Sequence, residues 1–175
     1  MNRNGDWIQT YTGKKFYPLD PRPEDICIED IAHALANTCR YNGHSRVFYS
    51  VAEHCVRMSL ANLPGCPKWL LMHDAAEAYI SDVPRPVKPM LEEFKAIENS
   101  ILSVIGEKFN LGEMDHRHIK WGDLVMLSTE KRDVLLHDLD WNLNLPEPLI
   151  GIIRPMEPRM AEVLFYKRAQ ELEII

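Results

Sequence analysis

Histidine and aspartate stand side by side in the run WLLMHDAAEAYISDVPRPVK, which covers residues 69–88. The run begins as an apolar helix, yet it carries His73, Asp74, Glu77 and Asp82 before a proline-rich basic turn. Ionisable side chains are rarely buried in a core unless they are paired or bind a metal. Imidazole and carboxylate together suit divalent first-row metals, from Mn to Zn. The run therefore indicates a metal site on a core helix.

Two more residues, His54 and Asp123, are candidates for the same site. His54 lies in the apolar stripe of SVAEHCVRM, where a single histidine is more often a hydrogen-bonded core residue. Asp123 stands between Trp121 and the apolar run LVML, where an unpaired carboxylate would be costly and a metal would explain it. Its rivals are Asp133, Asp138 and Asp140. A solvated or ion-paired state explains those three.

Apolar residues recur at i, i+3, i+4 and i+7 along most of the chain, a spacing that predicts helices. Proline and glycine mark where they end. The expected helices cover about 24–38, 46–62, 67–80, 89–109, 116–136 and 158–172. The first twenty residues alternate short β-prone runs around Thr12 and Gly13, which predicts a small hairpin or arm. We expect residues 1–175 to form a single all-α bundle with that N-terminal hairpin.

The composition, with 46% hydrophobic residues in 175, allows one soluble domain with a real core. No stretch is long enough to span a membrane, and the N-terminus lacks the apolar core of a signal peptide. The cysteines form no CxxC pair, which favours reduced thiols in a cytoplasmic protein; they are Cys27, Cys39, Cys55 and Cys66. The net charge of −6 argues against binding polymeric nucleic acid, whereas an anionic small molecule needs only a local basic pocket.

The order His, His-Asp, then a distant Asp resembles that of the HD-domain phosphohydrolases. Residues 73–88 follow the form HDxxExxxxDxPxPxK, SVAEH resembles the segment with the first metal ligand, and IKWGDLVML resembles the segment with the last. The bare HD dipeptide is a weak signal, but the extended motif is specific. The resemblance covers most of the chain and is nearest to the short phage-associated and bacterial relatives of the 5'-deoxynucleotidases.

The resemblance implies that His54, His73, Asp74 and Asp123 bind one divalent metal ion, with a position left open for water or substrate. Such a metal polarises a phosphoryl oxygen and lowers the pKa of water, so that hydroxide attacks phosphorus near neutral pH. The identity of the metal stays open, because two imidazoles and two carboxylates suit Mn, Fe, Co and Zn.

Glu77 and Asp82 are the expected catalytic residues. Glu77 follows Asp74 by three residues and His73 by four, which places it on the same helix face. The resemblance implies that it serves as general acid or base; the alternative is a solvated surface glutamate. Asp82 follows the helix end, where aspartate commonly caps or forms a turn. The resemblance gives it a part in water activation and substrate contact, and both interpretations of Asp82 stay open.

Candidate phosphate-binding residues surround the motif. Lys88 matches the family motif, whereas Arg85 stands where relatives vary and is equally well explained as a solvated loop residue. Arg40 and Tyr41 fall close to an Arg-Trp pair of the deoxynucleotidases, as a cation for phosphate and an aromatic wall for sugar or base. Here Tyr replaces Trp and the spacing is one residue shorter, which leaves sugar selectivity open. His44 is a rival metal ligand, a donor to phosphate or sugar, or a loop histidine.

These expectations favour a metal-dependent enzyme that removes the 5'-phosphate from deoxynucleoside monophosphates in the cytoplasm of a bacterium or a phage-infected cell. One alternative keeps the site but releases triphosphate from a deoxynucleoside triphosphate such as dATP. Another is a helical binding module with a structural metal, for which a closed four-ligand site would be typical. The resemblance also implies a homodimer or higher homo-oligomer, with a small-molecule nucleotide as the ligand and no membrane partner.

Overall fold

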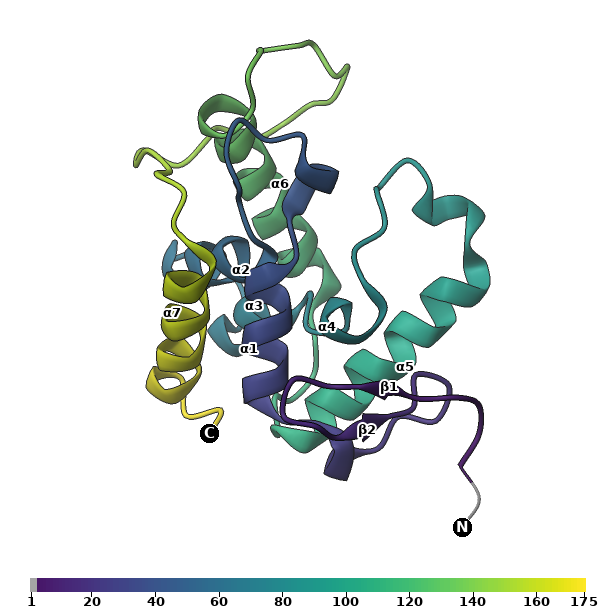
Figure 1. The fold of residues 1–175 in the computed structure, drawn as a ribbon. Coiled ribbons are helices and arrows are strands. Elements are labelled where there is room, and N and C mark those ends of the chain that lie inside the picture. The colour runs from purple at the N-terminus through teal and green to yellow at the C-terminus, as the bar shows by residue number, and fades with distance from the viewer. Residues whose placement is uncertain (1–2) are drawn as a thin grey trace.

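Helices make up most of the regular structure in the computed structural model, which describes residues 3–175 (Figure 1). They are α1 (Ile28–Asn37), α2 (Val51–Leu60), α3 (Pro67–Met72), α4 (Glu77–Ile80), α5 (Glu92–Lys108), α6 (His116–Asp133) and α7 (Pro158–Glu171). The strands β1 (Ile8–Gln9) and β2 (Lys15–Phe16) form an antiparallel hairpin. The predicted all-α fold with a small N-terminal hairpin is therefore confirmed.

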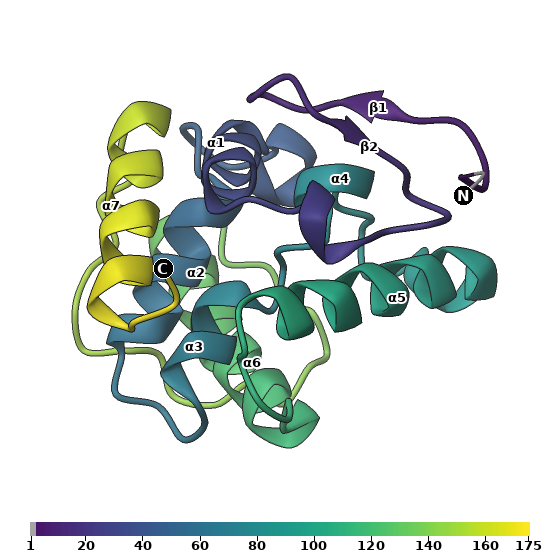
Figure 2. The same cartoon turned by 90° about the horizontal axis from the view of Figure 1, so that it is seen from below.

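Helix α2 lies at the centre of the packing. It contacts α1, α3, α6 and α7, and Figure 2 shows α2 and α3 enclosed between α7, α1 and α6. Residues 51–56 of α2 are all buried, including the polar side chains of Glu53 and His54. This position explains why His54 is in the core. None of the helices in residues 3–175 combines the length and apolar character needed to cross a membrane.

The predicted start of the second helix, at residue 46, is wrong. Helix α2 begins at Val51, where Ser50 is its N-cap and the Ser50 Oγ accepts a hydrogen bond from the Glu53 amide at 3.1 Å. Ser50 also forms a β-bridge with Cys39, so the chain before it is extended. Val47, which the predicted helix would include, is 57% exposed. The cap and the bridge decided the boundary, because an N-cap residue adopts a non-helical conformation.

The single helix predicted for residues 67–80 is also interrupted. Between α3 and α4 the backbone tightens: the Glu77 amide donates to the Asp74 carbonyl at 2.9 Å and the Tyr79 amide to the Ala76 carbonyl at 2.9 Å. These bonds join residues three apart, as in a 3₁₀-helix, where side chains at i and i+3 lie in line. The tightening therefore places Glu77 directly one turn after Asp74.

The N-terminal hairpin is held to α1 by Asp30, which is buried. Its carboxylate accepts hydrogen bonds from the Thr12 amide at 2.7 Å, the Thr12 hydroxyl at 3.0 Å and the Cys27 thiol at 2.9 Å. Burial alone would raise the pKa of Asp30, but the bonds from Cys27 and Thr12 outweigh it and hold that pKa below its usual range. Asp30 thus joins the hairpin to the helical body.

Replacing Asp30 with Asn should destabilise the protein by about 1–3 kcal/mol at neutral pH, the usual cost of disturbing a buried, charged hydrogen-bond acceptor. A folded-state pKa below the unfolded value contributes stability that is present above the unfolded value, about 3.9, and lost as the pH falls through the folded one. The difference from wild type should therefore shrink in acid. Urea unfolding at neutral pH and near pH 3 measures it.

Asp6→Asn is the control, because Asp6 is an exposed aspartate of the same arm that, within residues 3–175, accepts a hydrogen bond only from the Trp7 amide. It should change the free energy of unfolding by no more than about 0.5 kcal/mol. A loss of stability in Asp30→Asn that is equally large in acid would show that the Asp30 charge contributes nothing.

Candidate metal centre

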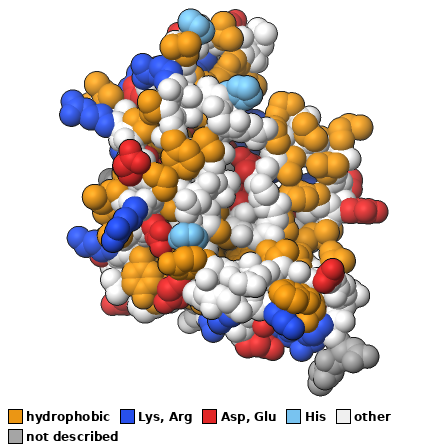
Figure 3. All heavy atoms as spheres, viewed as in Figure 1, with side chains coloured by type: hydrophobic (Ala, Val, Ile, Leu, Met, Phe, Trp, Pro, Cys, Tyr) orange, Lys and Arg blue, Asp and Glu red, His pale blue; other side chains and the backbone are white. Residues whose placement is uncertain are grey.

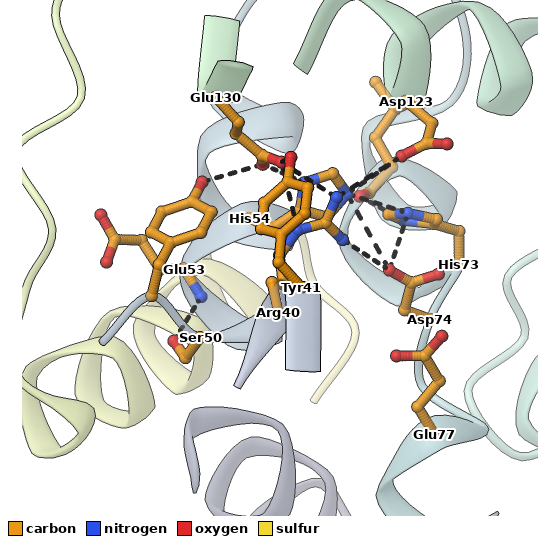
Figure 4. Close-up of polar contacts among 12 residues, drawn as sticks. Arg40, Tyr41, Ser50, Glu53, His54, His73, Asp74, Glu77, Asp123 and Glu130 are labelled. Atoms are coloured by element: carbon orange, nitrogen blue, oxygen red, sulfur yellow. Dashed lines mark hydrogen bonds and ion pairs between the residues drawn. The ribbon is translucent and has the colours of Figure 1, made fainter. Parts of the chain in front are cut away.

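His54, His73, Asp74 and Asp123 point toward one place, as Figure 4 shows, although they come from α2, from the turn after α3, and from α6. His54 Nε2 lies 3.4 Å from His73 Nε2 and 3.6 Å from Asp123 Oδ1. Asp74 Oδ2 lies 3.2 Å from His73 Nε2 and 3.9 Å from His54 Nε2. The structure thus brings together all four residues that the sequence suggested as metal ligands.

The spacing of these atoms fits a single metal ion. Nitrogen and oxygen ligands bind zinc at about 2.0–2.2 Å, which separates neighbouring ligand atoms by about 3–3.6 Å. The ligand atoms of His54, His73 and Asp123 all lie within 4.8 Å of one another, and Asp74 adjoins both imidazoles. In chemistry and in spacing, the residues present fit a divalent first-row metal.

Hydrogen bonds orient both imidazoles for metal binding. His54 Nδ1 donates to Glu130 Oε1 at 2.6 Å, and His73 Nδ1 donates to the Leu70 carbonyl at 3.1 Å. A carbonyl oxygen only accepts, so the proton of neutral His73 is on Nδ1. The Nε2 atoms of both rings therefore present lone pairs to the cluster. Such outer partners are the usual means by which proteins fix a ligating histidine.

Neighbouring groups set the protonation states within the cluster. Burial would raise the pKa of Asp74, but the neighbouring His73 outweighs burial and holds that pKa far below its usual range. Burial would likewise lower the pKa of His73, and the Asp74 carboxylate raises it instead. The Arg40 guanidinium lies 3.8 Å from Asp74 Oδ2 and 3.9 Å from Asp123 Oδ1. Asp74 is therefore held as a carboxylate, the form that binds metal.

Glu77 lies one turn after Asp74, and its side chain extends toward that residue (Figure 4). It is buried, its Oε1 is 3.6 Å from Lys88 Nζ, and within residues 3–175 its Oε2 has no hydrogen-bond partner. Burial and the charges of Asp74 and Asp82 raise the pKa of Glu77 well above its usual range. A buried acid with a raised pKa and a free oxygen is suited to exchange a proton with a bound molecule. The solvated-glutamate alternative is wrong.

Of the other predicted site residues, two lie near Glu77 and two are exposed away from the cluster. Lys88 pairs with Glu98 at 3.1 Å as well as facing Glu77. Asp82 is partly buried, close enough for its charge to act on Glu77. His44 and Arg85 are exposed, and among residues 3–175 no hydrogen bond or ion pair joins either side chain to the cluster. Their roles stay predictions.

Arg40 and Tyr41 reach the site from the turn between α1 and α2, a 3₁₀ segment (Arg40–Gly43). Arg40 donates through Nε and Nη2 to Glu130 Oε2 at 3.2 and 3.0 Å, and the Tyr41 hydroxyl donates to the same atom at 2.6 Å. The turn thus directs both side chains onto α6. The aromatic-wall role of Tyr41 stays a prediction.

Glu130 is a residue of the site to which the sequence interpretation gave no role, although it placed Glu130 and Asp123 on one side of the same helix. It is fully buried on α6, seven residues after Asp123, and it bonds His54 and Arg40. Seven residues are two helical turns, so Asp123 and Glu130 share one face of α6. That spacing was the signal that could have identified it.

Rival carboxylates on and after α6 are engaged elsewhere. Asp133 pairs with Arg132 at 2.7 Å and accepts from the Ile153 amide at 2.8 Å, and Asp138 pairs with Lys131. Asp140 accepts from the Asn142 amide at 2.8 Å. Paired states explain all three, as the sequence suggested. Asp123, by contrast, places its Oδ1 3.6 Å from His54 Nε2, the ring nitrogen that faces the cluster.

In the space-filling view, acidic side chains are visible at the middle of one face, in a recess beside the lobe that carries the start of α5 (Figure 3). The side chain of Asp123 is 44% exposed, whereas that of His54 is fully buried. The cluster is therefore open to solvent from the side of the carboxylates and closed behind the histidines.

Relatives are known for this chain. Over 169 residues, which are 95% of this chain and 95% of the relative, it is 39% identical to uncharacterized protein YfdR of Escherichia coli strain K12. The chain belongs to the YfdR family. Uncharacterized protein RCAP_rcc00048 of Rhodobacter capsulatus is 35% identical over 116 residues, 60% of this chain and 59% of that protein. No family model matches the chain. The chemistry must be inferred from the site.

Proposed function

We propose that this chain is a metal-dependent phosphohydrolase of the HD-domain type that removes the 5'-phosphate from deoxynucleoside monophosphates. One observation carries the proposal: two oriented histidines and two carboxylates meet around a space fit for one metal, with the buried acid Glu77 one turn away. A purely structural metal would not need a buried acid beside it. This favours the enzyme over a helical binding module.

His54, His73, Asp74 and Asp123 would hold the metal in this proposal. A divalent metal supplies Lewis-acid chemistry, polarising phosphoryl oxygens and acidifying water. The partly exposed side chain of Asp123 gives substrate an approach from solvent, whereas the buried His54 closes the site on its other side. In this proposal the residues around the metal position bind and orient the substrate and exchange protons with it.

Glu77 is assigned the proton transfer. Its carboxyl group is buried with a raised pKa, and Oε2, which has no hydrogen-bond partner among residues 3–175, is placed to donate a proton to the oxygen that leaves phosphorus or to take one from water. Lys88 Nζ, 3.6 Å from Glu77 Oε1, supplies positive charge on the same side. Arg40 supplies it on the other side, since its guanidinium lies beside Asp74 and Asp123.

A metal-exchange screen tests the proposal. The purified protein is stripped of metal, reloaded with Mn, Fe, Co or Zn, and given deoxynucleoside and ribonucleoside mono- and triphosphates. We expect inorganic phosphate and a deoxynucleoside from the monophosphates, with activity lost on chelation and restored by metal. Release of triphosphate from deoxynucleoside triphosphates would assign the alternative reaction. No turnover with any metal would reject the phosphohydrolase.

A further inference from the structure

Glu130 accepts hydrogen bonds from four side chains beside the metal cluster (Figure 4). Its Oε1 accepts from His54 Nδ1 at 2.6 Å and from the Tyr49 hydroxyl at 3.0 Å. Its Oε2 accepts from the Tyr41 hydroxyl at 2.6 Å and from Arg40 Nε and Nη2 at 3.2 and 3.0 Å. A carboxylate has about four lone-pair positions, so these donors leave none for a ligand.

The two oxygens of Glu130 serve different parts of the site. The Oε1 side fixes the His54 ring, whose Nε2 faces the metal position. The Oε2 side holds the guanidinium of Arg40, which lies beside the cluster carboxylates. Since an ionised partner makes these bonds short and strong, movement of Glu130 would displace both side chains.

The turn that carries Arg40 has a strained backbone. Tyr41 (φ 55°, ψ 28°) and Asn42 (φ 50°, ψ 31°) both adopt the left-handed conformation, which is unfavourable for side chains other than glycine. The base of the turn is closed by the Arg40 amide, which donates to the Tyr49 carbonyl at 2.9 Å. The Tyr41 hydroxyl, bonded to Glu130, holds its tip. A simple connection between α1 and α2 would not need this strain, and its effect is to aim two donors at one carboxylate.

We propose that Glu130 is a positioning residue that couples the two halves of the site, fixing His54 for the metal through one oxygen and Arg40 for the substrate phosphate through the other. The phosphate half rests on the proposed function, whereas the metal half rests on the cluster alone. The competing explanation is that Glu130 is only a buried structural carboxylate. It predicts a loss of stability without a change in either affinity.

Glu130→Gln separates these explanations, with Glu53→Gln as the matched control. Glu53 is equally buried on α2, next to His54 in the chain, but its oxygens accept from Arg57 Nε at 2.8 Å and the Met156 amide at 2.9 Å, away from the cluster. Both variants are measured for thermal stability, for Mn²⁺ affinity by calorimetry, and for inorganic phosphate affinity in the presence of saturating Mn²⁺. The readouts require no turnover.

We expect Glu130→Gln to weaken Mn²⁺ binding by about 10- to 100-fold, the range found when an outer partner of a metal ligand is lost. It should also weaken phosphate binding by at least about tenfold, the smaller end of the effect of losing a charged hydrogen bond. Glu53→Gln should leave both affinities within about threefold, because the outer partner of the metal ligand is intact there. Equal affinities in Glu130→Gln and wild type would overturn the coupling.

If Glu130→Gln does not fold, Tyr41→Phe tests whether the two oxygens of Glu130 have separate roles. It removes one donor from Oε2 and should weaken phosphate binding while the Mn²⁺ affinity stays at the wild-type value. Loss of Mn²⁺ affinity without loss of phosphate affinity would show that the two oxygens do not have these separate roles. A wild-type protein that binds Mn²⁺ but hydrolyses no nucleotide would reject the proposed function and leave only the role of Glu130 toward His54, whereas one that binds no metal would reject both.

Discussion

Replacing Glu77 with Gln is expected to lower kcat by about 10²- to 10⁴-fold, the usual contribution of a general acid or base, while divalent metal stays bound. Glutamine keeps the volume of the buried side chain but has no proton to exchange. The reason is the setting of Glu77, whose carboxyl group is buried, carries a raised pKa and leaves Oε2 without a partner. Steady-state kinetics and metal analysis of the purified variant measure both effects.

Glu98→Gln is the control for this experiment. Glu98 shares Lys88 with Glu77, at 3.1 Å, but belongs to α5 and not to the cluster. An ion pair of this kind is worth about 0–1 kcal/mol, so kcat should stay within about fivefold of wild type. Full turnover by Glu77→Gln would remove Glu77 from the mechanism, whatever happens to the control.

Asp123→Ala should abolish tight metal binding and, with it, turnover. The metal affinity should fall by more than the roughly 100-fold that the loss of an outer partner can cost. The fold should survive, because the Asp123 side chain is 44% exposed and its contacts to His54 and Arg40 are as long as 3.6 and 3.9 Å. Calorimetric titration with Mn²⁺ and thermal unfolding of the same sample distinguish loss of the site from loss of the fold.

Asp138→Ala is the matched control among the carboxylates that follow α6. Asp138 is exposed and pairs with Lys131 outside the cluster, so its removal should leave the metal affinity at the wild-type value. If Asp123→Ala kept the wild-type affinity while Asp138→Ala lost it, the fourth ligand would have been assigned to the wrong carboxylate.

Periodicity predicted the helices well because each buries an apolar face, but it failed where single residues decide the backbone. The second helix begins at Val51 since Ser50 caps it and bridges to Cys39. The third tightens after Met72 into bonds between residues three apart. Caps and local tightening depend on a few hydrogen bonds, which a hydrophobic pattern does not record.

The proposed ligands could be recognised because histidine and aspartate are rare in the core of a soluble domain. Glu130 could not be recognised in the same way, because it stands in the charged run STEKRD, where a solvated side chain is the ordinary expectation. Its burial is made possible by donors from Arg40, Tyr41 and Tyr49, which lie more than eighty residues earlier in the chain. Hydrogen bonds from such distant partners to Glu130 form only in the folded chain.

The left-handed turn at Tyr41 and Asn42, just before Gly43, was also beyond the sequence interpretation. Glycine does adopt a positive φ there, at 80°, but so do the two residues before it. The hydrogen bond from the Tyr41 hydroxyl to Glu130 helps to offset this strain. The conformation of the turn and the burial of Glu130 therefore depend on each other, and the sequence pattern alone predicts neither.

The most direct test of the proposal is the rate of inorganic phosphate release from dAMP as Mn²⁺ is titrated into the metal-free protein. The arrangement of His54, His73, Asp74 and Asp123 around one position predicts a rate that rises with Mn²⁺ and saturates at one equivalent per chain. Bound Mn²⁺ with no phosphate released from dAMP, or phosphate release that is independent of Mn²⁺, would contradict it.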